Sequence, residues 1–386
     1  MRQVQKVSRR KLFVVATSIL LAGCKVIPTQ GPEAPPPPRP GPTEGVLPSD
    51  GQRHRVALLV PLTGTNAMVG QAIANAATMA VLDTNARNIR ITNYDTGTSA
   101  ASAAAKAIAD GNRLILGPLS ADDIPAVASA AQSRQIPVIS FSSDDGAAGS
   151  GVFVMGSIPA QSITRTVTYA RQQGARRFAA LVPAGDYGQR ASSALMYAVH
   201  AQGGTLTAME TFDRRRGSLA GAARRLVAKG GYDAVLIADA ARLAAQAAPL
   251  LKPRGRPAPR LLGTELWSGD VTVSMTPAMR GGWFSAVSDS RFRQFAESYQ
   301  ARFGAQPPRL ATLGYDSVLL TVRLARDWRP GTTLPITRLV QSDSFVGVDG
   351  AFRFTAGGVI ERAFEVREVR AKGVTVVSPA PASFGN

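Results

Sequence analysis

The sequence predicts an α/β protein made of two lobes joined by a hinge, each lobe being a doubly wound parallel sheet. From residue 55 onward, short apolar runs alternate with longer amphipathic or Ala-rich runs, which is the pattern of parallel strands covered by helices on both faces. The alternation starts again after residue 156 and has too many units for one sheet. With 386 residues and 45% hydrophobic composition, the chain is long enough to bury two cores.

Lobe 1 is expected at residues 55–156 together with residues 281–340. The expected elements of its first part are, in order, the strand VALLVPL, a helix at residues 69–82, the strand IRITNY, an Ala-rich helix, the strand LILG, a helix at residues 122–133 and the strand IPVISF. The Ala-rich helix has Thr98 or Ser99 as its expected N-cap and Gly111 as its stop. After residue 281, RFRQFAESYQARFG and LGYDSVLLTVRLARDW are expected to be helical.

Lobe 2 is expected at residues 157–280 together with residues 341–378. Its first part has the strands RFAALVP, TLTAMETF, DAVLIAD and RLLG, separated by helical segments. The chain closes on strand-like DGAFRF and AFEVREV. Because the carboxyl ends of parallel strands meet at one edge of a sheet, each lobe is expected to present a row of strand ends to a cleft.

Residues 1–23 are predicted to be a lipoprotein signal peptide. A basic segment, MRQVQKVSRRK, precedes the apolar LFVVATSILLAG and then Cys24, the only cysteine, which becomes the lipidated first residue of the mature chain. An uncleaved anchor helix is disfavoured because the apolar run is shorter than the roughly 20 residues of a membrane span. SRRKLF resembles the twin-arginine motif, so export by the Tat or the Sec route is open. Lys25 favours the periplasmic face of the outer membrane.

Residues 24–54 are expected to be a tether. They contain nine prolines between Pro28 and Pro48, which prevents a helix or a sheet. As polyproline II, at about 3.1 Å per residue, its roughly 28 residues from Lys25 to Gln52 reach up to about 85 Å. It is therefore expected to hold the lobes away from the membrane.

The chain is strongly basic, with a formal net charge of +18. Five basic residues and no acidic ones lie in the predicted signal peptide, so the mature chain is basic as well. No aromatic-interleaved basic motif is present and the chain is exported, so nucleic acid is excluded as a partner. Anionic lipid head groups and cell-wall polymer are the partners of matching charge, and a solvated Arg-rich surface is the simpler explanation.

The sequence indicates a binding protein rather than an enzyme. DTGTS at residues 95–99 matches an aspartic protease loop, but that chemistry needs two such loops, and a helical segment follows this one. Elbow, phosphate-loop, zinc-protease and cysteine-nucleophile motifs are not found in the sequence. His54, placed in the tether, and His200, placed in a helix, lack metal-ligand spacing, so neither a metal nor a cofactor is expected.

Six motifs in order carry a family resemblance: LVPLTG, YDTGTS, LILGPLSADD, IPVISFSSDD, PAGDYG and LLGTELW. Together they resemble the type I periplasmic-binding fold, in the branch that holds leucine/isoleucine/valine-binding proteins and the penicillin-binding protein activator lipoproteins. The resemblance implies two lobes that close on a ligand, with three strands crossing between them.

The resemblance also implies ligand-cleft residues. Glu265 matches the acid that binds the ligand ammonium in amino-acid-binding members, Tyr187 matches a cleft tyrosine, and Ser142 lies where a backbone contact is expected. Asp95 ends the second strand beside the cleft mouth and the hinge. The candidate set is completed by Asp122, Asp144 and Asp239.

Three departures from the family pattern disfavour a plain amino acid as the ligand. Ala121 replaces a serine that holds the ligand carboxylate, Asp144 replaces a threonine, and Ala240 replaces a second tyrosine. An ionised Asp144 within about 4 Å of a ligand carboxylate costs on the order of several kcal/mol. Structural roles are the alternatives: helix-dipole compensation for Asp122, turn formation for Tyr187, and arginine pairing for Asp144 and Glu265.

Two functions remain open from the sequence. The first is an outer-membrane lipoprotein that engages a class A penicillin-binding protein and peptidoglycan through its bilobed domain. The second is a substrate-binding lipoprotein that delivers an amino acid or a related small molecule to an ABC permease. The acids Asp144 and Glu265 favour a cationic ligand in the second case.

Overall fold

The computed structural model describes residues 50–214, 217–252, 257–340, 344–382 and 384. The predicted signal peptide, Cys24 and nearly all of the tether lie outside the described residues. In the part of the chain that is described, no helix has the length and apolar character needed to cross a membrane.

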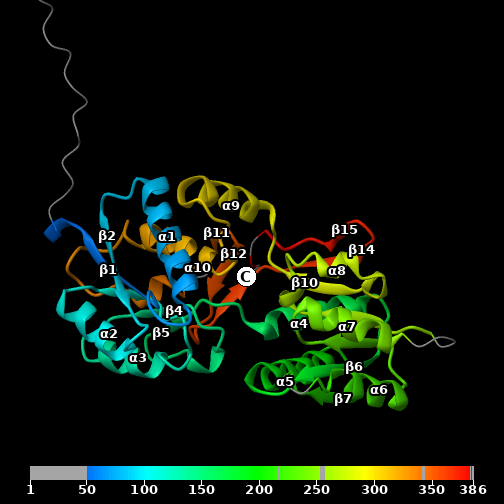
Figure 1. Cartoon of the computed structure of the whole chain (residues 1–386). Helices are drawn as coiled ribbons and strands as arrows, with labels where there is room; N and C mark the ends of the chain where they lie inside the picture. Colours follow the sequence, from blue (N-terminus) through cyan, green and yellow to red (C-terminus); the bar gives the residue numbers. More distant parts are fainter. Residues whose placement is uncertain (1–49, 215–216, 253–256, 341–343, 383, 385–386) are drawn as a thin grey trace, which may run out of the picture. The chain divides into compact units, whose positions relative to one another are not determined.

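The first sheet has five parallel strands in the order β2-β1-β3-β4-β5. The strands are β1 (His54–Val60), β2 (Ile89–Asp95), β3 (Leu114–Leu116), β4 (Val138–Ser140) and β5 (Val152–Val154). Because side chains alternate along a strand, Val56 and Leu58 face one core and Ala57 and Leu59 face another. The first core is covered by α1 (Ala67–Thr84) and α10 (Ala311–Leu324), and the second by α2 (Ala100–Ala109) and α3 (Ile124–Gln132) (Figure 1).

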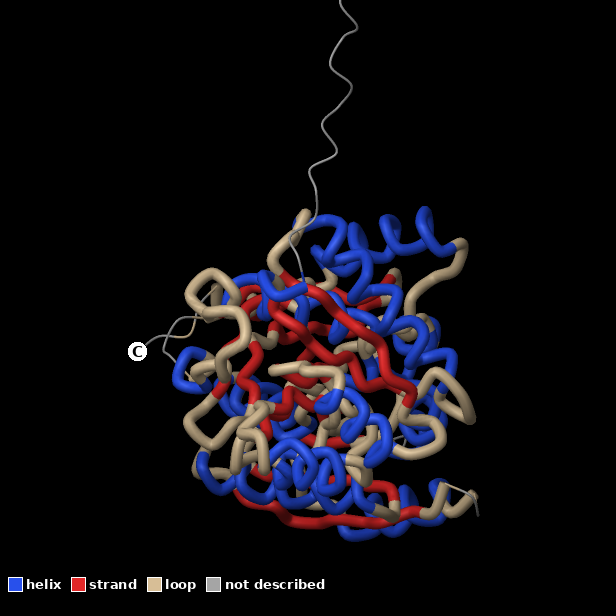
Figure 2. Tube along the Cα trace, turned by 90° about the vertical axis from the view of Figure 1, so that its left-hand side faces the viewer, coloured by secondary structure: helices blue, strands red, loops and turns tan. Residues whose placement is uncertain are grey.

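The second sheet has seven strands in the order β15-β14-β10-β9-β8-β6-β7. They are β6 (Arg177–Pro183), β7 (Thr205–Phe212), β8 (Ala234–Ile237), β9 (Arg260–Gly263), β10 (Trp283–Ala286), β14 (Glu365–Arg370) and β15 (Gly373–Ser378). One face packs on α4 (Pro159–Gln172) and α5 (Asp186–Ala201), and the other on α6 (Leu219–Lys229) and α7 (Ala241–Leu251). Figure 2 shows helices flanking the strands of both sheets.

The remaining elements are short or lie around the hinge. A third, antiparallel sheet consists of β11 (Phe345–Gly347), β12 (Gly350–Phe354) and β13 (Ile360–Arg362). Helix α9 (Ser290–Phe303) packs on α1, and α8 (Thr272–Met275) follows β9. Single turns of 3-10 helix lie at Asp50–Gln52, Asp145–Ala147, Glu265–Trp267, Pro277–Met279 and Ile336–Arg338.

In two places, strands lie in a different lobe from the one expected. Residues 283–286, expected in lobe 1, form β10 in the second sheet, because β10 pairs with β9 and β14. Residues 345–362, expected in lobe 2, form the small sheet, whose Phe345, Phe352 and Ile360 pack into the core of the first sheet. The chain accordingly passes between the two sheets after β5, after β10 and after β13.

Two local predictions are settled by the structure. Ser99 is the N-cap of α2, as predicted, because its Oγ accepts a hydrogen bond from Ser102 N. His54 was expected in the tether, and this placement is wrong. It begins β1, is 2% exposed, and stacks on Trp328 with ring centroids 4.2 Å apart.

Candidate functional site

Asp95 organises the loops at the strand ends of lobe 1. It is the last residue of β2, and its carboxylate accepts hydrogen bonds from Leu62 N at 2.7 Å, Thr63 N at 3.2 Å, Thr63 Oγ1 at 2.7 Å and Gly97 N at 2.8 Å. The Thr63 hydroxyl and these amides lower the pKa of Asp95 to about 2. Its oxygens are thus engaged in fixing the loop after β1.

Ser142 and Asp144 are held by their own loop. Ser142 is buried, and its Oγ accepts a hydrogen bond from Asp144 N at 3.1 Å. The carboxylate of Asp144 accepts from Gly146 N at 3.2 Å and lies 4.0 Å from Nη1 of Arg190, on α5 of the second lobe. The predicted arginine pairing of Asp144 is therefore present as a long contact between the lobes.

Asp122 lies on the surface before α3. Its side chain is exposed, and α3 begins at Ile124. The neighbouring Asp123 is partly buried, and both this burial and the charge of Asp122 raise the pKa of Asp123. This placement fits the structural alternative for Asp122 better than a ligand contact.

Tyr187 and Glu265 meet at the strand ends of lobe 2. Tyr187 Oη lies 3.0 Å from Thr264 Oγ1 and donates to Glu265 Oε1 at 3.4 Å. Burial, followed by the charge of Glu265, raises the pKa of Tyr187, and burial raises the pKa of Glu265. Glu265 is half-buried as a residue, but its Oε2 is covered and has no hydrogen-bond partner among the described residues.

Asp239 is paired within its own lobe. Its carboxylate accepts two hydrogen bonds from the Arg214 guanidinium, from Nε at 2.7 Å and from Nη2 at 2.9 Å. It also accepts from Ala240 N at 2.7 Å, and its backbone oxygen accepts from Trp267 Nε1. A buried carboxylate with these bonds is a structural element of the loop after β8.

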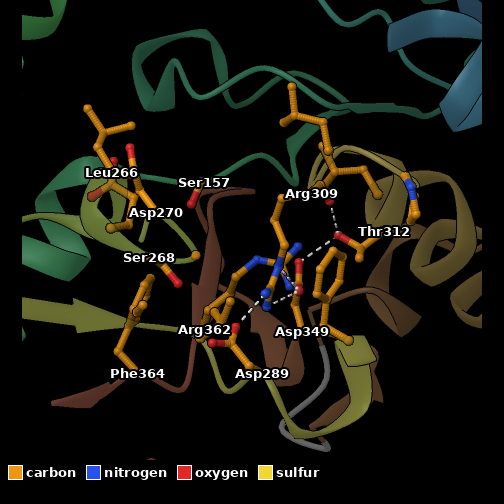
Figure 3. Close-up of a pocket in the computed structure, with 18 of the residues that line it drawn as sticks. Ser157, Leu266, Ser268, Asp270, Asp289, Arg309, Thr312, Asp349, Arg362 and Phe364 are labelled. Atoms are coloured by element: carbon orange, nitrogen blue, oxygen red, sulfur yellow. Dashed lines mark hydrogen bonds and ion pairs between the residues drawn. The ribbon is translucent and has the colours of Figure 1, made fainter. Parts of the chain in front are cut away.

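A cavity of about 900 Å³ lies at the hinge. It is bounded by residues from all three crossings, including Ser157, Val287, Arg362 and Phe364 (Figure 3). This volume is within the range of small-molecule sites, roughly 300–1,000 Å³. Among the candidates, Glu265 lines the cavity and Tyr187 contacts Glu265. The other five candidates lie elsewhere, in the loops described above: Asp95, Asp122, Ser142, Asp144 and Asp239.

An ionic network borders this cavity and joins four segments of the chain. Asp289, in the second crossing, receives Arg309 Nη1 on Oδ1 and Arg367 Nη1 on Oδ2, both at 2.6 Å. Arg309 also donates from Nε to Asp349 Oδ1 at 2.9 Å, and Arg367 donates from Nε to Glu365 Oε1 at 2.7 Å. Figure 3 shows Asp289, Arg309 and Asp349 side by side. The network links the turn before α10, which contains Arg309, to β14 of lobe 2.

Asp316 lies behind the network on α10. It is fully buried, and its carboxylate accepts from Val348 N at 2.7 Å and from Asp349 N at 3.4 Å. Burial raises the pKa of Asp316 to about 7, with the charge of Asp349 adding to this effect and that of Arg362 opposing it. Lobe 1 therefore contains, next to the hinge network, a buried carboxyl group whose pKa is raised by burial.

Sequence reasoning missed the polar residues of the hinge, chiefly Asp289, Arg309, Arg362 and Arg367. They are far apart in the chain and belong to no motif. One available signal was the placement of arginines inside apolar, strand-like segments, as in GVIERAFEVREV, where Arg362 and Arg367 are both buried. A buried arginine needs partners, and so indicates a polar cluster.

Three known proteins show similarity to this chain in structure or in sequence. A putative branched-chain amino acid ABC transporter protein from Rhodospirillum rubrum is 22% identical with a TM-score of 0.74, covering 84% of this chain and 100% of that one. Full-length LpoA from Haemophilus influenzae is 18% identical with a TM-score of 0.67, covering 84% of this chain and 59% of that one. An uncharacterized protein of Rickettsia prowazekii, RP748, is 27% identical over 160 residues, which are 41% of this chain and 43% of that protein.

The family itself follows from a match over most of the sequence. Residues 54–374 match the model of a family described as periplasmic binding protein. The matched region begins at the first residue of β1 and ends within β15, so it takes in both lobes and the hinge. The chain belongs to this family of periplasmic binding proteins, with the type I fold.

Proposed function

We propose that this protein is a non-catalytic, lipid-anchored binding protein at the periplasmic face of the outer membrane, and that it acts on peptidoglycan synthesis through a protein partner. The observation that carries the proposal is that the polar residues at the strand ends are already hydrogen-bonded or ion-paired within the protein. Ser142, Asp144 and Asp239 are engaged by their own loops and by arginines. The hydroxyl expected at position 121 is an alanine. A recognition site for an amino acid needs free groups at these positions.

The likeness to LpoA, a penicillin-binding protein activator, supports the choice of partner. Both chains share the bilobed fold, and the present chain spans 59% of LpoA. The predicted lipidation of Cys24 and the predicted tether supply the anchor and the reach that a partner across the cell wall requires. On this proposal the partner is a class A penicillin-binding protein acting on peptidoglycan.

The test is capture of the partner from membranes. The tagged full-length lipoprotein is crosslinked in cells, solubilised and purified, and the co-purifying proteins are identified. Enrichment of a bifunctional penicillin-binding protein is the expected result. The matched control is a Cys24→Ser variant, which keeps the lobes and removes the acylated thiol, and which is expected to capture the partner less efficiently. Recovery of an importer permease without a synthase contradicts the proposal.

A second function, solute binding for an ABC permease, is favoured by the hinge cavity. The cavity of about 900 Å³ includes Glu265, whose Oε2 has no partner in the described part of the chain. The likeness to the Rhodospirillum rubrum transporter protein agrees with this role. Calorimetry with amino acids, amides, polyamines and muropeptides tests it. A micromolar ligand whose binding is lost in Glu265→Gln supports solute binding, and an unaffected ligand contradicts a role for Glu265.

A further inference from the structure

We infer that lobe 2 binds an anionic phospholipid surface through the edge of its sheet at which the parallel strands begin. This edge is opposite the strand-end loops, because Tyr187 and Glu265 follow the carboxyl ends of β6 and β9. The inference goes beyond the proposed function, since it concerns a surface outside the cleft and depends neither on the lipid anchor nor on the protein partner.

Strand order brings six basic side chains together along this edge. Five belong to strands or to the turns and loops that lead into them, and these five are exposed. Neighbouring strands lie about 4.8 Å apart, so the row from β15 to β6 is roughly 24 Å long. We call this set the basic edge. It comprises, in the order of the strands from β15 to β6, Lys372, Arg370, Arg280, Arg260 and Arg176, together with Lys252 after α7.

Contacts in the middle of the basic edge show that its cations are close to one another. Lys252 Nζ donates to Arg280 O at 3.4 Å, and Arg260 Nη1 donates to Gly281 O. The Arg260 guanidinium also lies over the Trp283 ring, 4.2 Å from its centre. Burial, followed by the charge of Arg260, lowers the pKa of Lys252. The cations therefore repel one another, and a bound anion relieves this repulsion.

The acids near the basic edge do not neutralise it. Among the described residues these acids are Asp233, just before β8, and Glu368 on β14. Asp233 accepts from Arg177 Nη2 at 2.9 Å, and Glu368 pairs with Arg370 at 3.2 Å. The other five cations of the basic edge have no ion pair within the described part of the chain. The edge consequently carries a net positive charge that faces solvent.

Helix dipoles do not account for this accumulation of charge. A cation beside a helix C-terminus is stabilised by the dipole, and Lys252 is the C-cap of α7. Arg370 and Lys372 lie at the turn between two strands, and Arg260 begins a strand. These cations have no helix end to compensate, so an anionic partner is the better explanation for them.

Exposed apolar side chains beside the basic edge favour a bilayer over a soluble polyanion. Val374 and Val376 on β15 are 43% and 46% exposed, and Met275 on α8 is 76% exposed. Helix α8 packs against β14 and β15 (Figure 1). Cations bind the lipid phosphates, and neighbouring apolar side chains enter the boundary with the acyl chains. A soluble polyanion satisfies the cations and leaves the apolar side chains in water.

Membrane binding through this edge keeps the cleft side of lobe 2 accessible. The basic edge and the carboxyl ends of the parallel strands are at opposite ends of one sheet. When the basic edge lies on the bilayer, the loops that contain Tyr187 and Glu265 therefore face away from it. Lobe 2 can rest on a membrane and still engage a partner through these loops.

The experiment measures vesicle binding by the mature chain from residue 24 with Cys24→Ser. This protein has neither signal peptide nor acyl chain, so binding reports the folded lobes. It is sedimented with vesicles of phosphatidylcholine alone, or of phosphatidylcholine with one third phosphatidylglycerol. We expect binding to the anionic vesicles only, and weaker binding as salt is raised. Equal binding to both kinds of vesicle, or binding to neither, overturns the inference.

Two triple variants then locate the surface. Arg176→Gln with Arg280→Gln and Lys372→Gln is expected to weaken binding to the anionic vesicles by roughly 10- to 100-fold. These side chains have no ion pairs among the described residues, so the fold is expected to persist, which circular dichroism checks. The control makes the same charge change at three exposed arginines outside the basic edge and is expected to keep most of the affinity: Arg87→Gln, Arg134→Gln and Arg293→Gln. Equal losses in the two variants show that only net charge matters and overturn the inference.

A further variant distinguishes the bilayer from a soluble acidic polymer. Met275→Gln with Val374→Thr is expected to weaken vesicle binding by roughly 3- to 10-fold, because less apolar surface enters the bilayer. Its binding to poly-glutamate is expected to equal that of the parent protein. If this variant binds vesicles as well as the parent does, the edge is a site for a soluble polyanion and the lipid inference is wrong. Since no acyl chain or protein partner is present, failure here is separate from failure of the proposed function.

Discussion

The strand-end loops and the hinge cavity are both rich in polar side chains, but they use them differently. At the strand ends, Asp95 accepts from three backbone amides and a hydroxyl, and Asp239 forms a two-bond pair with Arg214. At the hinge cavity, Arg362 Nη1 and Glu265 Oε2 are buried without partners among the residues described. The strand-end acids build their own loops, whereas the hinge retains unused hydrogen-bonding capacity.

This difference shows how a binding site is recognised in such a fold. A carboxylate at the end of a strand is a ligand candidate by its position, but its hydrogen bonds decide whether it is available. In this protein the positions that resemble the family's cleft are mostly occupied by intramolecular bonds. The groups left without partners lie at the crossings, which sequence position alone does not single out.

The largest effect is expected from a substitution that breaks the hinge network. Arg367 is 2% exposed and bonds to both Asp289 and Glu365. Arg367→Met keeps the volume but leaves Glu365 without its arginine and Asp289 paired with Arg309 alone, so the free energy of unfolding is expected to fall by about 3–5 kcal/mol. Urea unfolding followed by circular dichroism measures the change.

The control for this prediction lies on the same strand. Arg370 pairs with Glu368 at 3.2 Å, but its side chain is 57% exposed. Arg370→Met is expected to change the free energy of unfolding by less than about 1 kcal/mol. Similar losses in the two variants contradict the view that burial makes the hinge network important.

Most of the fold was accessible to sequence reasoning because its elements are strongly periodic. The expected strands RFAALVP, TLTAMETF and RLLG coincide with β6, β7 and β9. The short strands β11, β13 and β15 were not predicted. β11 and β13 have three residues each, which is too short to show a period, and β15 lies at a sheet edge with no buried residue, so its sequence lacks a clear alternation of apolar and polar side chains.

The candidate site was predicted less completely, for a physical reason. Motif position singled out both Glu265 and Tyr187, and the structure shows these two side chains in contact. Motif position carries no information on whether a polar group is already bonded, as Ser142 and Asp239 are. The hinge residues Asp289, Arg309 and Arg362 come together only through the three crossings, which are non-local contacts.

The second prediction concerns two glycine substitutions at the tightest contacts of the strand-end loops. A Cβ at Gly70 would lie 1.8 Å from Pro61 O, and one at Gly188 would lie 1.7 Å from Pro183 O, so both lobes pack a helix closely on the loop after their first strand. Gly70→Ala and Gly188→Ala are each expected to destabilise the protein by about 1–3 kcal/mol.

Gly221, within α6, is the matched control, because the nearest atom to an added Cβ is the flexible end of Arg225 at 3.6 Å. Gly221→Ala is expected to stabilise the protein by about 0.5–1 kcal/mol. Thermal unfolding of the three variants measures these effects. If Gly70→Ala and Gly188→Ala both match Gly221→Ala, the close packing at the strand ends is disproved.

The third prediction uses pH to separate the strand-end acid Asp95 from Asp316, the buried acid behind the hinge network. Asp316 has a pKa of about 7 in the folded protein, against 3.8 as the ordinary value, so the folded state holds its proton more tightly. Its contribution to stability is present below about pH 4 and is lost as the pH rises to about 7. Asp95 has a pKa of about 2, so its contribution is present above about pH 4 and is lost as the pH falls towards 2.

The variants Asp316→Asn and Asp95→Asn test these opposite slopes. The free energy of unfolding is measured from pH 3 to pH 8. In the wild type it is expected to fall as the pH rises above 4, and this fall is expected to be absent in Asp316→Asn. It is also expected to fall as the pH drops below 4, and this fall is expected to be smaller in Asp95→Asn. Each variant is the control for the other, since both replace one aspartate in lobe 1. A decline above pH 4 that persists in Asp316→Asn shows that another group causes it.

The smallest expected effect concerns the contact that joins the two cleft faces. Asp144 and Arg190 are 4.0 Å apart and each side chain is 35% exposed, so solvent screens the pair. A double-mutant cycle with Asp144→Asn and Arg190→Gln is expected to give a coupling energy below about 1 kcal/mol. The coupling is expected to vanish in 1 M salt, where the screening length is about 3 Å. A coupling that is larger and unaffected by salt indicates that the lobes close over this pair and bury it, which would make the strand ends resemble the hinge.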